Sequence, residues 1–243
     1  YIQEIAEALK GVDIPVFVKN PIHPELGLWI GAFERLNKAG ITQLAAIHRG
    51  FYSYEKSAFR NDPKWEIPIK LREELQDIPI ICDPSHIAGK SSIIEDISQT
   101  AMDLNLDGLM IESHCNPSLA LSDAKQQVTP EKLKNIMKNL VVRDTKLRDE
   151  IFKEQLLKFR NQIDIFDNKI VELLNNRKDV VEEIAKFKSK NQLTIFQLER
   201  WFEILRTRKE VANNLGLDAQ MISELFELIH KYSILTQTKI MRK

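Results

Sequence analysis

The chain has 243 residues, of which 43% are hydrophobic and 29% charged, an ordinary balance for one large or two modest folded domains. Its formal net charge is zero and its longest apolar runs are only as long as strands, so we expect neither a nucleic-acid-binding surface nor a membrane-spanning segment. Two cysteines without a secretory signal favour the reducing cytoplasm, and a start at Tyr1 rather than Met favours a fragment of a longer protein.

Residues 1–140 alternate short apolar runs with helical runs. The strand-like runs are "IPVFVK", "ITQLAAIHRG", "IPIICDPSH" and "LDGLMIESH". The helical stretches that follow them are 26–38, 67–75, 91–104 and a helix opened by Pro130. Continuous apolar strands that alternate with helices are typical of a parallel sheet with crossover helices. The sequence therefore predicts four βα units of an α/β fold.

Charged and metal-ligand side chains follow these strands. The strand ends carry Lys19, Arg49, Asp83 with His86, and Glu112, and Asp123 comes soon after. Polar loops explain any one of them, but in a (β/α)8 (TIM) barrel the carboxyl ends of the strands build the active site. The cations suit a phosphate and a carboxylate, whereas His86, Glu112 and Asp123 suit a divalent metal. Cys82 should point to the opposite strand face from Asp83, into the core.

These motifs resemble the second half of the type I-beta 3-deoxy-D-arabino-heptulosonate 7-phosphate (DAHP) synthases. The resemblance rests on "VKNP", "HRG", "DPSH", "MIESH" and "ALSDAKQ" and spans about residues 1–125. It implies that Lys19 and Arg49 bind phosphoenolpyruvate, and that His86, Glu112 and Asp123 bind Mn²⁺ or a similar divalent metal. The family condenses phosphoenolpyruvate with erythrose 4-phosphate. Its metal cysteine and its lysine–arginine–proline loop belong to the first four βα units and have no match here, so we expect the parent protein to carry that missing half-barrel.

A long helical run covers Phe152 to Lys188, beyond a charged join at residues 141–149. Its apolar residues alternate at four- and three-residue steps, which indicates a helix with one buried seam. The seam comprises Phe152, Leu156, Phe159, Ile163, Phe166, Ile170, Leu173, Val180, Ile184 and Phe187. A helix on the order of 50 Å long cannot bury such a seam within one small domain, so it needs a partner.

Arg177 stands in that seam where an apolar residue is expected. Burying a guanidinium without an anion costs several kcal/mol, so Arg177 either reaches solvent or an acid, or binds an anionic ligand. Lys188 lies about three turns (~16 Å) further on, so both side chains can close on one small ligand. Arg160 is roughly 25 Å from Arg177 and would serve the site of an antiparallel partner.

Two more helices are predicted, from about Ile195 to Asn214 and from an N-cap at Asp218 onward. The first offers Gln197 and Arg200 one turn apart. The second has an apolar stripe interrupted by a polar face, with Ser233 and Gln237 one turn apart. A polar helix end near solvent explains this face if it is considered alone.

Together these residues resemble the all-helical chorismate mutases over about the last 90 residues. The resemblance implies a three-helix domain that forms an intertwined homodimer and converts chorismate to prephenate without a cofactor. The implied substrate-binding residues are Arg160 (from the partner) and Arg177 for carboxylates, Lys188 and Gln237 at the ether oxygen, and Arg200 and Ser233 for remaining carboxylate and hydroxyl contacts. Two positions depart from the family pattern: Trp201 stands where a hydroxyl-binding glutamate is usual, and Gln197 where an aspartate is usual.

The sequence therefore predicts a fusion: residues 1–140 as the C-terminal half of a DAHP synthase barrel, 141–149 as a linker and 150–243 as a chorismate mutase domain. In the parent, the resemblance implies aromatic amino acid biosynthesis with feedback by prephenate or chorismate. Two alternatives stay open. The helical domain would otherwise be a dimerising sensor of chorismate or prephenate, which Trp201 favours, or a structural coiled coil, which Arg177 disfavours.

Overall fold

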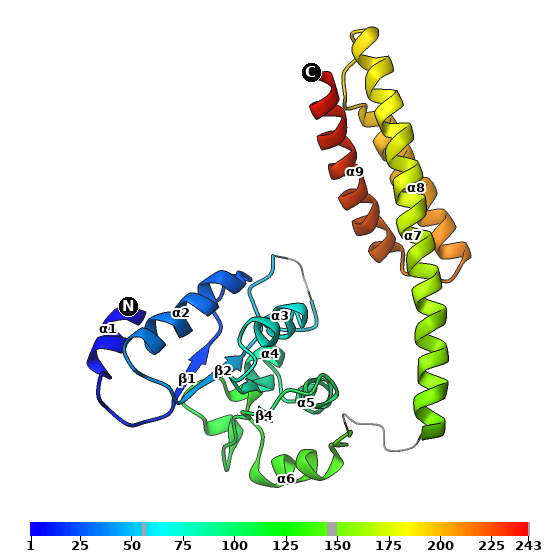
Figure 1. The fold of residues 1–243 in the computed structure, drawn as a ribbon. Helices are drawn as coiled ribbons and strands as arrows, with labels where there is room; N and C mark the ends of the chain where they lie inside the picture. Colours follow the sequence, from blue (N-terminus) through cyan, green and yellow to red (C-terminus); the bar gives the residue numbers. More distant parts are fainter. Residues whose placement is uncertain (55–56, 145–149, 243) are drawn as a thin grey trace. The chain divides into compact units, whose positions relative to one another are not determined.

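A computed structural model describes residues 1–54, 57–144 and 150–242 (Figure 1). The chain divides into two compact units, Tyr1–Lys146 and Leu147–Lys243. We call them the α/β unit and the helical unit. Of the predicted linker 141–149, residues 145–149 lie outside the described residues. Val141 still belongs to the α/β unit, because its backbone N–H and carbonyl both hydrogen-bond to the side chain of Gln99, at 2.9 and 3.0 Å.

The α/β unit contains a parallel four-stranded sheet in the order β1-β2-β3-β4. Its strands are β1 (Val16–Lys19), β2 (Leu44–His48), β3 (Ile80–Cys82) and β4 (Gly108–Leu109). Its helices are α1 (Ile2–Ala8), α2 (Leu26–Lys38), α3 (Glu66–Glu74), α4 (Pro84–Ala88), α5 (Ile94–Asp103) and α6 (Pro130–Asn139), with 3-10 turns η1 (Pro117–Leu119) and η2 (Ala124–Gln126). The predicted α/β fold of four βα units, a partial barrel, is confirmed.

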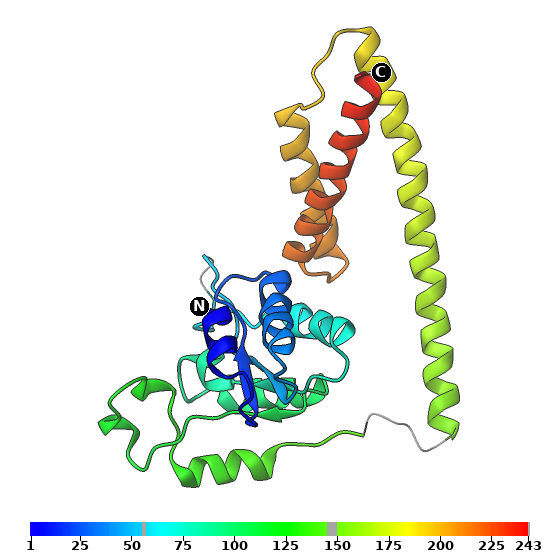
Figure 2. The same cartoon turned by 60° about the vertical axis from the view of Figure 1, so that its left-hand side comes forward.

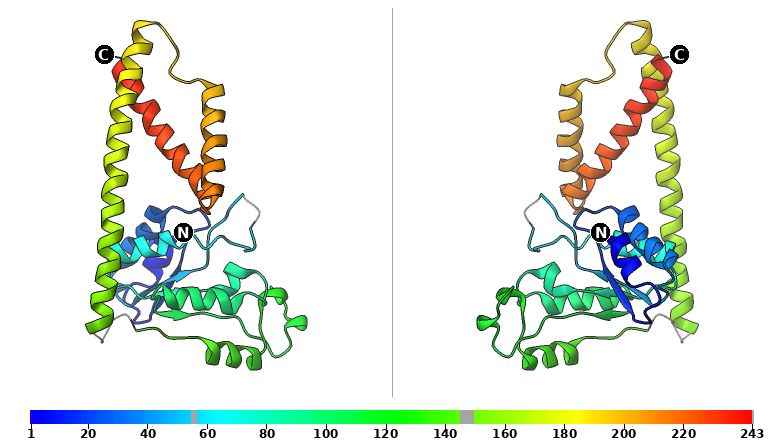
Figure 3. Two further views of the ribbon diagram at one scale, coloured as in Figure 1. Left: turned by 90° about the vertical axis from the view of Figure 1, so that its right-hand side faces the viewer. Right: turned by 90° about the vertical axis from the view of Figure 1, so that its left-hand side faces the viewer.

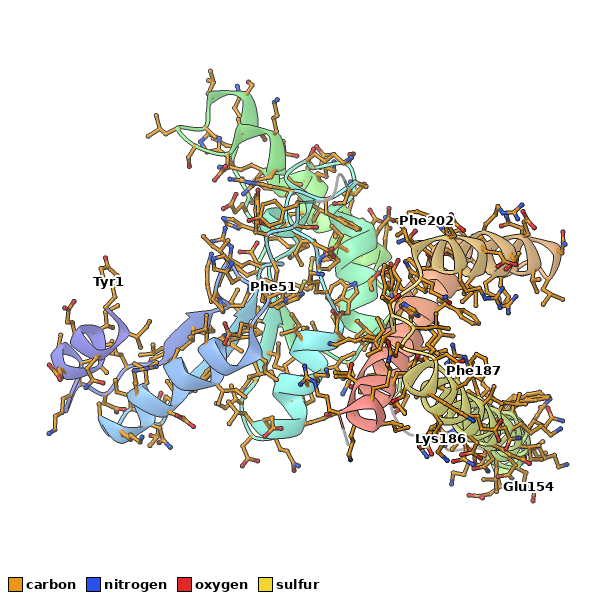
Figure 4. All side chains as sticks on the ribbon, turned by 90° about the horizontal axis from the view of Figure 1, so that it is seen from above. Tyr1, Phe51, Glu154, Lys186, Phe187 and Phe202 are labelled. Carbon is orange, nitrogen blue, oxygen red and sulfur yellow. The ribbon has the colours of Figure 1, made fainter. Side chains whose placement is uncertain are left out.

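The core of the α/β unit lies between the sheet and its helices. Val18, Ala46 and Ile80 form one register row across three strands, and all three are buried. Trp29 of α2 packs over this row and its indole N–H donates to the carbonyl of Val18, at 3.1 Å. Figure 4 shows Phe51 in the interior of this unit, where it is 0% exposed. One face of the sheet is thus covered by the unit's own helices, and it is buried along this row.

The other face of β1 is not covered within the described chain. Phe17, which points away from Val18, is 48% exposed. Cys82 has its side chain on the covered face and is 0% exposed, as predicted, and burial raises the pKa of its thiol.

The helical unit consists of α7 (Glu150–Lys190), α8 (Leu198–Asn214) and α9 (Ala219–Met241). A chain reversal at Gly216, whose φ is +70°, separates α8 from α9. Asp218 caps α9 as predicted, since its carboxylate accepts from the backbone N–H groups of Gln220 and Met221 at 2.7 and 2.8 Å. Figure 3 shows α9 running diagonally from the end of α8 to the end of α7, so that it packs against both.

The predicted apolar seam of α7 is exposed in a single copy of the chain. Nine of its ten residues are between 42% and 66% exposed: Phe152, Phe159, Ile163, Phe166, Ile170, Leu173, Val180, Ile184 and Phe187. The residues that α7 buries within its own unit are Val181, Ala185 and Lys188. The first half of α7 extends beyond α8 and α9 (Figure 2), and in its second half these three residues, rather than the seam, are buried. None of the described helices is both long and apolar enough to span a membrane.

Candidate active sites

The first site lies at the carboxyl ends of the strands, around the buried carboxylate of Asp83. Asp83 follows β3 and is 1% exposed. Its Oδ2 lies 3.3 Å from Nζ of Lys19 and 2.8 Å from Nδ1 of His86. Its Oδ1 accepts from the backbone N–H of His86 at 3.1 Å, which caps α4. Asp83 thereby positions one predicted phosphoenolpyruvate ligand and one predicted metal ligand.

Asn20 joins the ends of β1 and β2. Its side-chain amide donates to the carbonyl of Gly50 at 2.8 Å, and its Oδ1 accepts from the backbone N–H of Arg49 at 2.7 Å. Asn20 is 4% exposed, so these bonds are shielded from water. Because Asn20 follows Lys19 directly, it fixes the two predicted cations, Lys19 and Arg49, on adjacent strand ends.

The three predicted metal ligands converge. One ligand atom from each of His86, Glu112 and Asp123 lies within 4.8 Å of the others. Nε2 of His86 faces Glu112 Oε1 at 3.7 Å, while Nδ1 faces Asp83. An imidazole with a buried carboxylate near one nitrogen and two acids near the other resembles the surroundings of histidines that bind divalent metals. The donor atoms are nitrogen and carboxylate oxygen, which suit Mn²⁺-type ions.

Two residues that the sequence analysis did not single out connect the acids of this cluster. Arg60 donates from Nη1 to Asp123 Oδ1 and to Gln126 Oε1, both at 2.7 Å. Gln126 in turn donates to Glu112 Oε2 at 2.9 Å and is 1% exposed. The bond from Arg60 is the main cause that lowers the pKa of Asp123, with smaller contributions from the charges of Arg60, His86 and Arg49.

The second site lies in the helical unit, where Arg177 of α7 meets Ser233 of α9. Nη1 of Arg177 donates to Ser233 Oγ at 2.7 Å, and Ser233 donates to the carbonyl of Ile229 at 2.8 Å. Burial, and secondarily the charge of Arg208, lower the pKa of Arg177. Among the described residues no carboxylate pairs with Arg177, so its charge is only partly compensated.

Lys188 is the second cation of this site. It is 8% exposed, and its Nζ donates to the carbonyl of Ile195 at 2.6 Å. Burial lowers its pKa, and within the described chain it forms no ion pair with an acid. Gln237, also 8% exposed, has a buried Oε1 without a hydrogen-bond partner. Two cations and a side-chain amide therefore lie at this site, and no acidic side chain of the described chain pairs with the cations.

Arg160 and Arg200 are not brought to this site within one copy. Arg160 is exposed on the first half of α7. Arg200 is exposed and pairs with Glu203 at 2.6 Å, an i, i+3 contact on α8 that the sequence analysis did not foresee. Their predicted roles toward a ligand stay predictions.

Trp201, which stands where a hydroxyl-binding glutamate was expected, packs against another side chain of the helical unit. Its indole stacks on the imidazole of His230, with ring centroids 4.2 Å apart and planes at 18°. Phe196 contacts the same imidazole with its ring tilted, at 5.9 Å. Sequence reasoning missed His230, because one histidine in an amphipathic helix carries no signal until its neighbours are known.

Comparison with known proteins identifies a family for each unit. Residues 2–149, well over half of the chain, match the family model described as DAHP synthetase I family. The chain belongs to the DAHP synthetase I family. Residues 159–238 match the model described as chorismate mutase type II. The chain is therefore a fusion of a DAHP synthase region with a chorismate mutase domain, as predicted.

Individual relatives cover one part of this DAHP synthetase family chain or the other. The phospho-2-dehydro-3-deoxyheptonate aldolase of Thermotoga maritima is 27% identical over 52% of this chain and 37% of its own length. A truncated DAHP synthase structure from the same organism matches with a TM-score of 0.50 at 25% identity, over 56% of this chain and 51% of that one. The bifunctional chorismate mutase/prephenate dehydratase of Buchnera aphidicola is 38% identical over 37% of this chain and 24% of its own length. The chain thus spans well under two thirds of these relatives.

Proposed function

We propose that the helical unit is a chorismate mutase, which converts chorismate to prephenate. The observation that carries the proposal is a pair of cations, the half-buried Arg177 and the buried Lys188, which have no acid among the described residues. Cations held away from water are costly unless an anion compensates them, and chorismate carries two carboxylates. Both family matches are to enzymes, which favours turnover over the alternative of a purely sensing module.

The reaction fits the groups present. The rearrangement is pericyclic, so no proton has to move and no cofactor is required; catalysis consists of holding the compact conformer and stabilising charge that develops on the ether oxygen. Arg177, oriented by Ser233, would bind a carboxylate with its planar fork. Lys188 and the side-chain amide of Gln237 would act at the ether oxygen, and Arg200 would complete the carboxylate contacts.

We further propose that the active species is a homodimer through α7. The exposed seam of α7 is too apolar and too continuous to face water, and a second copy of the same helix offers a matching surface. In an antiparallel pair, Arg160 of each copy would enter the site of the other. The division into a DAHP synthase region, a linker and a chorismate mutase domain at 150–243 is part of the same proposal, with Val141 assigned to the α/β unit rather than to the linker.

For the α/β unit, we propose the DAHP synthase role in the longer protein, in which phosphoenolpyruvate condenses with erythrose 4-phosphate. Lys19 and Arg49 would bind phosphoenolpyruvate, and His86, Glu112 and Asp123 would hold a divalent metal such as Mn²⁺. Such a metal polarises a carbonyl oxygen when bound. Asp83 keeps the His86 ring turned toward this position, and Arg60 with Gln126 aligns the two acids. The free thiols of Cys82 and Cys115 agree with a reducing cytoplasm as the compartment.

The test of the mutase is the loss of chorismate absorbance with this chain, without metal, and then with Arg177→Leu. We expect turnover that falls at least ~10³-fold in the variant, because the charge that binds a substrate carboxylate is lost. Arg206→Leu is the matched control, since Arg206 is exposed on α8, and it should retain activity. In a structural coiled coil, Arg177→Leu would instead only stabilise the dimer. Binding of prephenate without turnover would identify a sensor.

A further inference from the structure

The polar stripe of α9 extends one step beyond the predicted pair of residues. His230, Ser233 and Gln237 follow one another at three- and four-residue spacing, so they share one face of the helix. Ser233 is satisfied by Arg177 and by the carbonyl of Ile229. Nε2 of His230 and Oε1 of Gln237, on either side of it, are buried without a hydrogen-bond partner. A buried polar atom without a partner costs roughly 1–3 kcal/mol, so this stripe is incomplete until something binds to it.

The surroundings of His230 fix its chemical form. Burial first, and then the charges of Arg177 and Lys188, lower the pKa of His230, so the imidazole is neutral at pH 7. A neutral imidazole carries one proton, so one of its two nitrogens is an acceptor. With the proton on Nδ1, the buried Nε2 is an acceptor of hydrogen bonds. A lone pair repels a carboxylate but accepts from a hydroxyl.

The ring is also held in place before a ligand arrives. Trp201 stacks on one side of it at 4.2 Å, and Phe196 contacts it at 5.9 Å. Both aromatic residues come from the α8 end of the unit, whereas His230 belongs to α9, so the packing of two helices determines where Nε2 lies. An acceptor that is immobilised in advance loses little conformational entropy on binding.

From these observations we propose that His230 is a further substrate-binding residue of the helical unit, whose Nε2 accepts a hydrogen bond from the ring hydroxyl of the ligand, with Trp201 as a positioning residue. The inference rests on the proposed mutase function, because it takes chorismate or prephenate as the ligand; both carry such a hydroxyl besides two carboxylates. It gives the departure at Trp201 a role, since the hydroxyl contact is made by the side chain that Trp201 holds.

The experiment measures the affinity of prephenate for the full chain by calorimetry. His230→Phe keeps the stacked ring but lacks the acceptor, and we expect about tenfold weaker binding with an unchanged thermal midpoint. His230→Gln places an amide near the position of Nε2 and should recover most of the affinity. His230→Asn reaches only the position of Nδ1 and should resemble His230→Phe. Equal affinities of wild type and His230→Phe would overturn the proposal; if that variant unfolds, Gln binding no better than Asn would overturn it instead.

Trp201 is tested in the same assay by rescue. Trp201→Ala should weaken the binding of prephenate several-fold, whereas Trp201→Phe, which can still stack on His230, should restore the affinity. Equal affinities of the two variants would contradict the positioning role.

Chorismate turnover separates the proposed mutase function from the proposed role of His230. Graded binding across the His230 variants without turnover in wild type supports His230 and refutes the mutase. Turnover that is the same in wild type and His230→Phe supports the mutase and refutes His230. Failure of wild type to bind prephenate refutes the His230 proposal.

Discussion

The α/β unit and the helical unit bury their apolar side chains in opposite ways. In the α/β unit, the large residues Trp29, Phe51 and Leu71 are each 0% exposed inside one copy. In the helical unit, Phe159, Phe166 and comparable side chains of α7 are more than half exposed, and the buried residues of α7 are Val181, Ala185 and Lys188. Phe51 and Phe187, both labelled in Figure 4, show the same contrast, because they are 0% and 63% exposed. Hydrophobic free energy thus stabilises the first unit alone, whereas the second would gain it in the proposed dimer.

The acids of the metal cluster and the polar stripe of α9 also differ, although His48 and His86 of the α/β unit have buried nitrogens without a hydrogen-bond partner as well. In the α/β unit, Arg60 donates to Asp123 and to Gln126, and Gln126 donates to Glu112, in hydrogen bonds of 2.7–2.9 Å. In the helical unit, His230 and Gln237 keep buried atoms without partners. The first arrangement preserves a geometry, and the second leaves interaction energy to be gained from a ligand.

The largest effect that sharpens this comparison is expected from Phe166→Asp. A charge in the middle of the α7 seam would occur twice in a dimer and replace two buried rings, so we expect dimerisation to weaken at least ~10³-fold. Sedimentation velocity across a concentration series measures this directly. Asn168→Asp adds the same charge on the opposite side of α7 and should leave the dimer intact. A wild-type chain that sediments as a monomer throughout would contradict the homodimer.

The same contrast explains what could be predicted from sequence. The bounds of α2 at Leu26–Lys38 and the cap at Asp218 were predictable, because both depend on local patterns. The stripe Val181, Ala185 and Lys188 was not, since it lies one residue from the stronger seam and periodicity does not identify which neighbour packs on which stripe. Helix α4 was not predicted, because it is too short to show the periodic pattern of a helix.

The site residues were likewise predictable where local sequence patterns place them, and not where tertiary packing does. Lys19, His86 and Glu112 were found because they follow strands whose ends must meet at one edge of a sheet. Arg60 and Gln126 act on that edge from loops, so their position depends on tertiary packing. The pairing of Arg200 with Glu203 was missed because the predicted role of Arg200 was taken from resemblance.

A smaller effect, confined to the α/β unit, should follow from His48→Phe. His48 is 0% exposed among Trp29, Phe51 and Trp65, and burial lowers its pKa to about 3. The unfolded chain takes up this proton near pH 6.5, so wild type loses stability as the pH falls from about 6.5 toward 3, by ~2 kcal/mol between pH 6.5 and 5.

The variant packs an aromatic ring at the same place without a proton to gain, so that part of the acid sensitivity should disappear. Urea unfolding at pH 7 and pH 5, followed by tryptophan fluorescence, measures the difference. An equal loss of stability in both proteins would show that His48 is protonated while the unit stays folded. His23, which is exposed in the same unit, offers the control His23→Phe, whose acid sensitivity should match that of wild type.

The smallest effect is expected at the metal site. It tests whether a change there alters metal binding by the α/β unit without altering prephenate binding by the helical unit. Glu112→Gln removes one anionic donor from the cluster with His86 and Asp123 and should weaken Mn²⁺ binding about tenfold, as measured by the paramagnetic resonance signal of free Mn²⁺. Glu34→Gln, an exposed change on α2, should not alter it. Because Gln126 can still donate to the side-chain oxygen of the residue at position 112, the α/β unit should stay folded.

Prephenate affinity and dimer mass should be the same in both variants, since the site of the helical unit takes no residue from the sheet. A loss of prephenate binding in Glu112→Gln would mean that the two sites are energetically coupled, and that the division into a self-contained unit and an associating unit is incomplete.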